Sequence, residues 1–106
     1  MELMKMIGFG VAGNFAGHLE QAGEASDFVN VQVKDAIQPK AIFPFYVPHI
    51  ENSFLNAFPV SHDQIQFPQG ADNLQIEPEV CLICDIEYEN DKVKTLTPRE
   101  FAAFND

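Results

Sequence analysis

LQIEPEVCLICDIEY, residues 74–88, has the strongest secondary-structure pattern in this 106-residue chain. Apolar residues stand at every second position from Ile76 to Tyr88. That period is typical of a β-strand with one face in a core, because successive side chains of a strand point to opposite faces. A turn signal follows at Glu89–Asp91, and Lys92–Leu96 is predicted to return as the partner strand. We therefore expect a β-hairpin here.

Two carboxylates of this strand, Glu77 and Glu79, are candidate metal ligands. Side chains at positions i and i+2 leave the same face about 7 Å apart, so both can turn toward one cation. A third carboxylate, Asp106, stands at the end of the sequence. Three hard oxygen donors favour Mg²⁺, Mn²⁺ or Ca²⁺ over zinc. The alternative is a solvated strand face, since Asp85 and Glu87 continue the acidic row.

The composition is that of a globular and acidic protein. Hydrophobic residues make up 46% of the chain, and the formal net charge is −10 at pH 7. Nucleic acid and anionic membranes both attract basic patches, so we expect neither as a partner. No apolar run approaches the roughly 20 residues that span a bilayer. Met1–Gly10 also lacks the apolar stretch and cleavage site of a secretory signal.

Cys81 and Cys84 form a C-x-x-C motif. Residues i and i+3 of a strand point to opposite faces and lie about 10 Å apart, beyond the roughly 7 Å limit for a disulfide. A zinc site would need a second pair of ligands, and His18, His49 and His62 are scattered without ligand spacing. We expect two free thiols in a reducing compartment, and hence a cytoplasmic protein.

Further elements are expected on both sides of a proline-rich middle, Gln38–Pro68, where extended pieces and loops should prevail. Lys5–Phe9 and Phe28–Val33 have the composition of strands, and Ala12–Ala22 that of a short helix. Pro98–Phe104 should begin a second helix, because it follows an N-cap Thr and has Pro at its first position. The prediction is one unit, residues 1–106, with a β-rich α+β fold.

Gly8–Gly13 fits G-x-G-x-x-G, with a short strand before it and a predicted helix after it. Asp35 follows the next predicted strand, where an acid that binds ribose would be expected. This spacing supports a nucleotide-binding module as an alternative function. The structural alternative is a turn in which glycine allows tight packing or a positive φ.

Five segments in order resemble the fumarylacetoacetate hydrolase family. They are a glycine-rich segment ending in His, an apolar strand, an Asp-x-Ile turn, a Glu-x-Glu pair and an Asn-Asp: Gly8–His18, Ala41–Phe43, Asp63–Pro68, Glu77–Glu79 and Phe104–Asp106. The resemblance implies an incomplete fold of this type, with mixed β-sheets and short helices around a divalent-cation site. It also implies that residues 1–106 are the N-terminal part of a longer domain.

The activity implied by the resemblance is that of a metal-dependent hydrolase or decarboxylase for a small keto acid or diketo acid, which is a small-molecule carboxylate substrate. Glu77, Glu79 and Asp106 would hold Mg²⁺ or Mn²⁺. His18 would activate water or relay a proton. Its partner would be Glu20 or Glu24, because Gln21 stands where the family often has Glu.

The resemblance also implies a truncated and inactive chain, since family segments that follow the Asn-Asp have no counterpart. Unpaired strands would then favour a homo-oligomer. A non-catalytic acidic interaction domain remains a further alternative to the enzyme.

Overall fold

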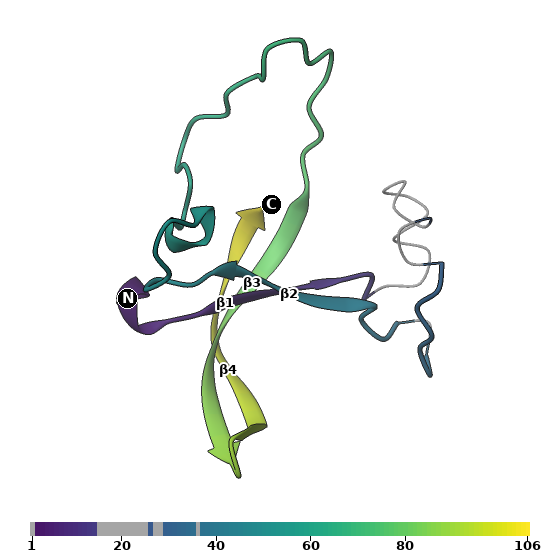
Figure 1. Cartoon of the computed structure of the whole chain (residues 1–106), viewed down its shortest axis with the longest axis vertical. Coiled ribbons are helices and arrows are strands. Elements are labelled where there is room, and N and C mark those ends of the chain that lie inside the picture. Colours follow the sequence, from purple (N-terminus) through teal and green to yellow (C-terminus); the bar gives the residue numbers. More distant parts are fainter. Residues whose placement is uncertain (1, 15–25, 27–28, 36) are drawn as a thin grey trace. The chain divides into compact units, whose positions relative to one another are not determined.

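The computed structural model describes the chain except for residues 1, 15–25, 27–28 and 36. The described residues form two antiparallel two-stranded sheets and two single-turn 3-10 helices (Figure 1). They divide into two compact units, Met1–Ile65 and Gln66–Asp106, with one sheet in each. Within these described ranges, no helix has the length and hydropathy needed to cross a bilayer.

In the first unit, strand β1 (Gly8–Ala12) pairs antiparallel with β2 (Ala41–Tyr46). The 3-10 helix η1 (Leu3–Lys5) precedes β1, and η3 (Phe54–Asn56) follows β2. Backbone hydrogen bonding ties η3 to the end of β2, since the Val47 N–H donates to the Leu55 carbonyl at 2.7 Å.

Tyr46 is the one buried hydrophobic residue among those described, with 4% of its surface exposed. Its ring centroid lies 5.6 Å from that of Phe58, which in turn lies 5.3 Å from that of Phe45. Such tilted aromatic pairs are favourable beyond the area they bury. The Tyr46 hydroxyl also donates a weak hydrogen bond to Met4 Sδ at 3.9 Å. The core of this unit is therefore a small aromatic cluster in which Phe58 lies between Phe45 and the buried Tyr46.

Aromatic rings of β2 lie over two glycines of β1. A Cβ atom at Gly8 would lie 2.6 Å from Phe45 Cε2, and one at Gly10 would clash with the Phe43 ring. Gly13, directly after the strand, has a φ of 65°. Gly8 and Gly10 therefore make room for aromatic side chains within an antiparallel strand, and Gly13 supplies a positive φ directly after it.

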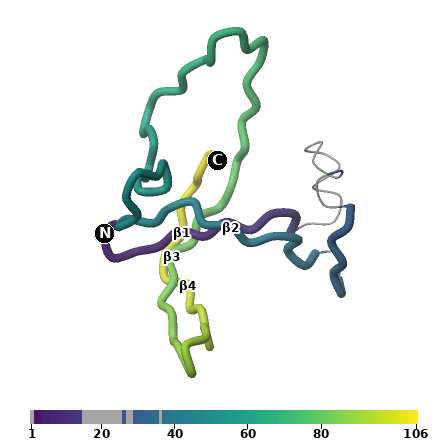
Figure 2. Tube along the Cα trace, in the orientation of Figure 1, coloured from purple at the N-terminus to yellow at the C-terminus, as the bar shows by residue number. Residues whose placement is uncertain are grey.

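The second unit is one long β-hairpin (Figures 1 and 2). Strand β3 (Pro78–Glu89) pairs antiparallel with β4 (Lys92–Asn105). The two turn residues, Asn90 and Asp91, have φ values of 53° and 59°. Positive φ at both central positions is the signature of the type I′ turn, whose twist matches that of the flanking strands. This confirms the predicted hairpin and its turn.

The predicted α+β class, with mixed sheets and short helices, is wrong. Every sheet in the described part of the chain is antiparallel, and its helical residues form only 3-10 turns. Pro98–Phe104, predicted as a helix from its capping signal, belongs to β4. Pairing with β3 overrides the local signal, because it satisfies the backbone groups of both strands. Pro98 is tolerated because β4 is an edge strand with a register shift beside it.

Other boundaries also differ from the predictions. The first strand begins at Gly8, since Leu3–Lys5 is a 3-10 turn, and β3 begins at Pro78. No described residue of Phe28–Val33 belongs to a strand, and most of the predicted helix Ala12–Ala22 lies outside the described residues. That residues 1–106 are one part of a longer domain stays a prediction.

Candidate metal centre

The open end of the hairpin holds the three candidate ligands. Glu77 directly precedes β3 and Asp106 directly follows β4, and Pro78 pairs with Asn105 between the strands. The Asp106 N–H donates to the Glu77 carbonyl at 3.2 Å. In the other direction, the Glu77 N–H donates to Asn105 Oδ1 at 2.9 Å. These two bonds extend the ladder by one pair, so that Asp106 lies directly opposite Glu77.

All three carboxylates belong to one face of the hairpin. Residues directly opposite each other in an antiparallel pair share a face, with Cα atoms roughly 4.5–5.5 Å apart. Glu79 shares that face because it is two residues from Glu77, at a spacing of about 7 Å. The register therefore brings Asp106 to the acidic pair.

The three carboxyl groups do not converge as a formed metal site. No three His, Cys, Asp or Glu side chains in the described part of the chain are grouped so that they could hold a metal ion. None of the three carboxylates forms a hydrogen bond or ion pair with another described residue. Glu79 and Asp106 are exposed and Glu77 is half-buried. Their chemistry as donors fits Mg²⁺ or Mn²⁺.

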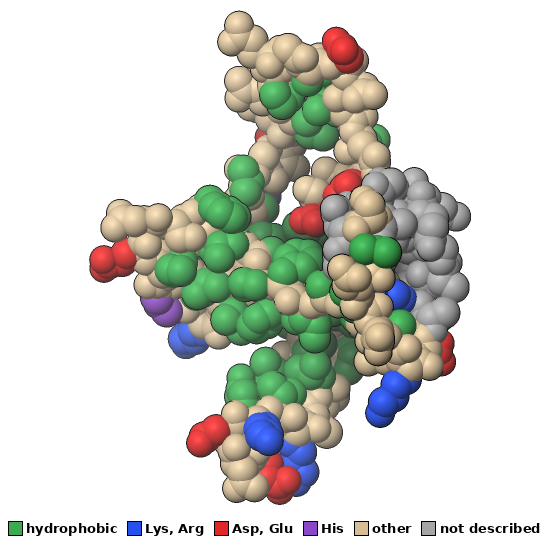
Figure 3. All heavy atoms as spheres, turned by 45° about the vertical axis from the view of Figure 1, so that its right-hand side comes forward, with side chains coloured by type: hydrophobic (Ala, Val, Ile, Leu, Met, Phe, Trp, Pro, Cys, Tyr) green, Lys and Arg blue, Asp and Glu red, His purple; other side chains and the backbone are tan. Residues whose placement is uncertain are grey.

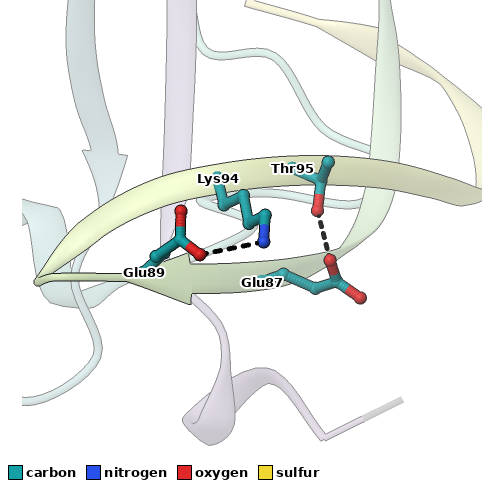
Figure 4. A network of polar contacts seen from close by, with 4 residues as sticks. All are labelled: Glu87, Glu89, Lys94 and Thr95. Atoms are coloured by element: carbon teal, nitrogen blue, oxygen red, sulfur yellow. Dashed lines mark hydrogen bonds and ion pairs between the residues drawn. The ribbon is translucent and has the colours of Figure 1, made fainter.

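The acidic residues of β3 nearer the turn differ, because each has a partner on β4. Thr95 Oγ1 donates to Glu87 Oε2 at 2.6 Å, and Lys94 Nζ lies 3.0 Å from Glu89 Oε1 (Figure 4). Arg99 Nε donates to Asp85. The acidic row thus has two parts: a turn half with partners, and an open end of unpartnered like charges.

Asn105 is the residue of this region to which sequence reasoning assigned no role. Its side-chain oxygen accepts a hydrogen bond from the backbone N–H of Glu77, which lies just before β3. A hint was present in the sequence, because Asn directly precedes the third candidate ligand. Its contact with a residue 28 positions away could be seen only in the folded hairpin.

Asn105→Ala is expected to weaken Mn²⁺ binding about three- to tenfold. It removes the hydrogen bond from the Glu77 N–H to Asn105 Oδ1, and the loss of such a bond costs about 0.5–1.5 kcal/mol. The loss frees the Glu77 backbone and loosens the pairing of Glu77 with Asp106. Calorimetric titration with Mn²⁺ measures the change, and Asn73→Ala, which truncates an exposed asparagine outside the hairpin, is the matched control. Unchanged affinity in Asn105→Ala would contradict the positioning role.

The predicted acid–base residues, His18 and Glu20, lie outside the described residues, as do Gln21 and Glu24. Their role stays a prediction. Asp35, the expected ribose ligand, instead accepts a hydrogen bond from the Ile37 N–H at 3.1 Å within its own turn. Together with the antiparallel β1–β2 pair, this leaves the nucleotide-binding alternative without support from the described residues.

Comparison with known proteins gives one match. The model of a family described as a family of unknown function (DUF5718) matches residues 24–106. No curated protein and no solved structure matches the chain. The resemblance to the fumarylacetoacetate hydrolase family therefore stays a prediction.

Proposed function

Because the chain belongs to the DUF5718 family, whose function is unknown, we propose a function from its own residues. It is a divalent-metal-dependent hydrolase or decarboxylase that acts on a small keto acid or diketo acid. Glu77, Glu79 and Asp106 hold Mg²⁺ or Mn²⁺ in this proposal.

The division of the acidic row is the observation that carries the proposal. The carboxylates of β3 toward the turn have partners on β4, whereas Glu77, Glu79 and Asp106 lie on one face of the open end without any among the described residues. Neighbouring like charges repel each other, and a divalent cation relieves that repulsion when enough oxygen atoms complete its shell.

A divalent ion held there would polarise a carbonyl oxygen of the substrate. Glu77, Glu79 and Asp106 would hold that ion on one face of the hairpin. A keto acid suits such a site, because its carboxylate and keto oxygen can approach the same cation. His18, with Glu20 as its partner, is the proposed group that moves the proton.

The metal site is tested by comparing two glutamates on one face of β3. Glu79→Gln is expected to weaken Mn²⁺ binding more than tenfold, because it removes a charged ligand. Glu87→Gln, the matched control, should change the affinity less than twofold, since Glu87 bonds to Thr95 near the turn. Calorimetric titration with Mn²⁺ gives both values. Equal losses of Mn²⁺ affinity in the two variants, or no Mn²⁺ binding by the unsubstituted chain, would contradict the proposed metal site.

The resemblance implies that residues 1–106 by themselves are inactive, so the reaction class is tested on the longer domain of which they are the predicted N-terminal part. The substrates are a panel of small keto acids and diketo acids in the presence of Mn²⁺. His18→Ala is expected to lower turnover at least 100-fold, since a general acid–base group contributes about 10²–10⁴-fold. Its Mn²⁺ affinity should stay within twofold of the original, because His18 is not a proposed ligand. Unchanged turnover in His18→Ala would contradict the proposed role of His18 in proton transfer. It would not contradict the proposed metal site.

A further inference from the structure

The β3–β4 hairpin has an apolar face opposite its acidic one. Along this face the register places three apolar cross-strand pairs: Leu82–Phe101, Ile86–Leu96 and Tyr88–Val93. We use the term apolar face for the side of the hairpin that carries these three pairs. All six side chains are exposed, by fractions between 37% for Ile86 and 82% for Phe101. Apolar side chains also reach the surface in the space-filling view (Figure 3).

Charged side chains are kept off this face. β4 is two residues longer than β3, and the register shifts leave Lys94 and Arg99 without a cross-strand partner in the ladder. Both side chains turn to the acidic face, where Lys94 meets Glu89 and Arg99 meets Asp85. From Leu82–Phe101 to Tyr88–Val93, every cross-strand pair on the apolar face is therefore uncharged. Two copies of a chain with a net charge of −10 can meet through it without bringing like charges into contact.

The size of the face also fits a second copy. A lone two-stranded hairpin is marginally stable in water, and a hydrophobic face gains stability by burial. Six exposed side chains, two of them aromatic, offer on the order of 600 Å² of apolar surface. A standard protein interface buries about 800 Å² per partner, so that burying this face and its rim reaches the required size.

We propose that the apolar face is an interface between two copies of this chain. The two hairpins pack face to face about a two-fold axis, as sheets do in a sandwich, at a spacing of about 10 Å. Each copy covers the other's Leu82–Phe101 pair, and both acidic faces point to solvent. The interface is independent of the proposed metal site, which lies on the opposite face.

The two native cysteines supply the test. Cys84 pairs with Pro98 at the middle of the apolar face, and Cys81 pairs with Ala102 on the acidic face. Both are free thiols and half-buried in the single chain. Cys81→Ser and Cys84→Ser each leave one thiol to react with a disulfide reagent. Rising protein concentration should slow modification of Cys84 at least tenfold and leave Cys81 unchanged, while light scattering shows the mass doubling from 11.9 kDa.

Phe101→Lys is expected to raise the dissociation constant of the dimer at least tenfold, because it buries a charge at the interface. Phe101 is 82% exposed in the single chain, so that the substitution removes few contacts within it. The matched control is Thr97→Lys, on the same strand but on the acidic face opposite Asp85, with an expected change below twofold. Three results would overturn the proposal. They are a monomer at all concentrations, equal effects of Phe101→Lys and Thr97→Lys on the dissociation constant, and association that leaves Cys84 unprotected from the reagent.

Discussion

Tyr46→Ala is expected to unfold the unit Met1–Ile65, with a loss of about 3–5 kcal/mol, as for other large aromatic residues truncated in a core. Tyr46 is the one buried hydrophobic side chain among the described residues, and its ring contacts Phe58. A domain is stable by only about 5–15 kcal/mol, and a unit with so small a core belongs at the low end. Hydrogen exchange of the β1 and β2 amides, followed by mass spectrometry, measures the loss.

Two control variants separate burial of the ring from other effects of residue 46. Tyr46→Phe keeps the ring and removes only the weak hydrogen bond to Met4, so that the expected loss is below about 1 kcal/mol. Phe54→Ala, which truncates an aromatic ring that is 85% exposed, should change stability by no more than about 0.5 kcal/mol. Equal losses for Tyr46→Ala and Phe54→Ala would mean that the aromatic cluster is not the core of this unit.

The double substitution Asn90→Val with Asp91→Val is expected to disrupt the β3–β4 hairpin. Both residues have positive φ, a region that β-branched side chains enter only with strain. Holding them there costs of the order of 1–3 kcal/mol per residue. Because a two-stranded hairpin is marginal by itself, this cost should be enough to speed exchange of the β3 and β4 amides.

Asp91→Gly is the matched control for the turn. It creates Asn-Gly, the dipeptide preferred in type I′ turns, and should slow amide exchange in the hairpin or leave it unchanged. If the double valine variant exchanged as slowly as the original chain, then the turn geometry would not be what holds the two strands in register.

The predicted hairpin rested on local signals that only one structure satisfies. Alternation from Ile76 to Tyr88 requires a strand, and Asn90–Asp91 tolerates the positive φ of a tight turn. Strand bounds could not be found in this way, because a strand extends as far as its partner does. β4 accordingly continues through Pro98–Phe104 to Asn105, past a capping signal that predicts a helix. Cross-strand pairing outweighed that signal.

The candidate site likewise has features that follow from local sequence and features that depend on cross-strand pairing. That Glu77 and Glu79 share a face could be predicted from the sequence, since it follows from the period of a strand. That Asp106 lies opposite Glu77 could be seen only in the folded chain, because the register across two shifts in the ladder sets that pairing. The same holds for the hydrogen bond from the Glu77 N–H to the Asn105 side chain, and for the partners of Asp85 and Glu87 on β4. These contacts join residues between 8 and 29 positions apart, and no local pattern encodes them.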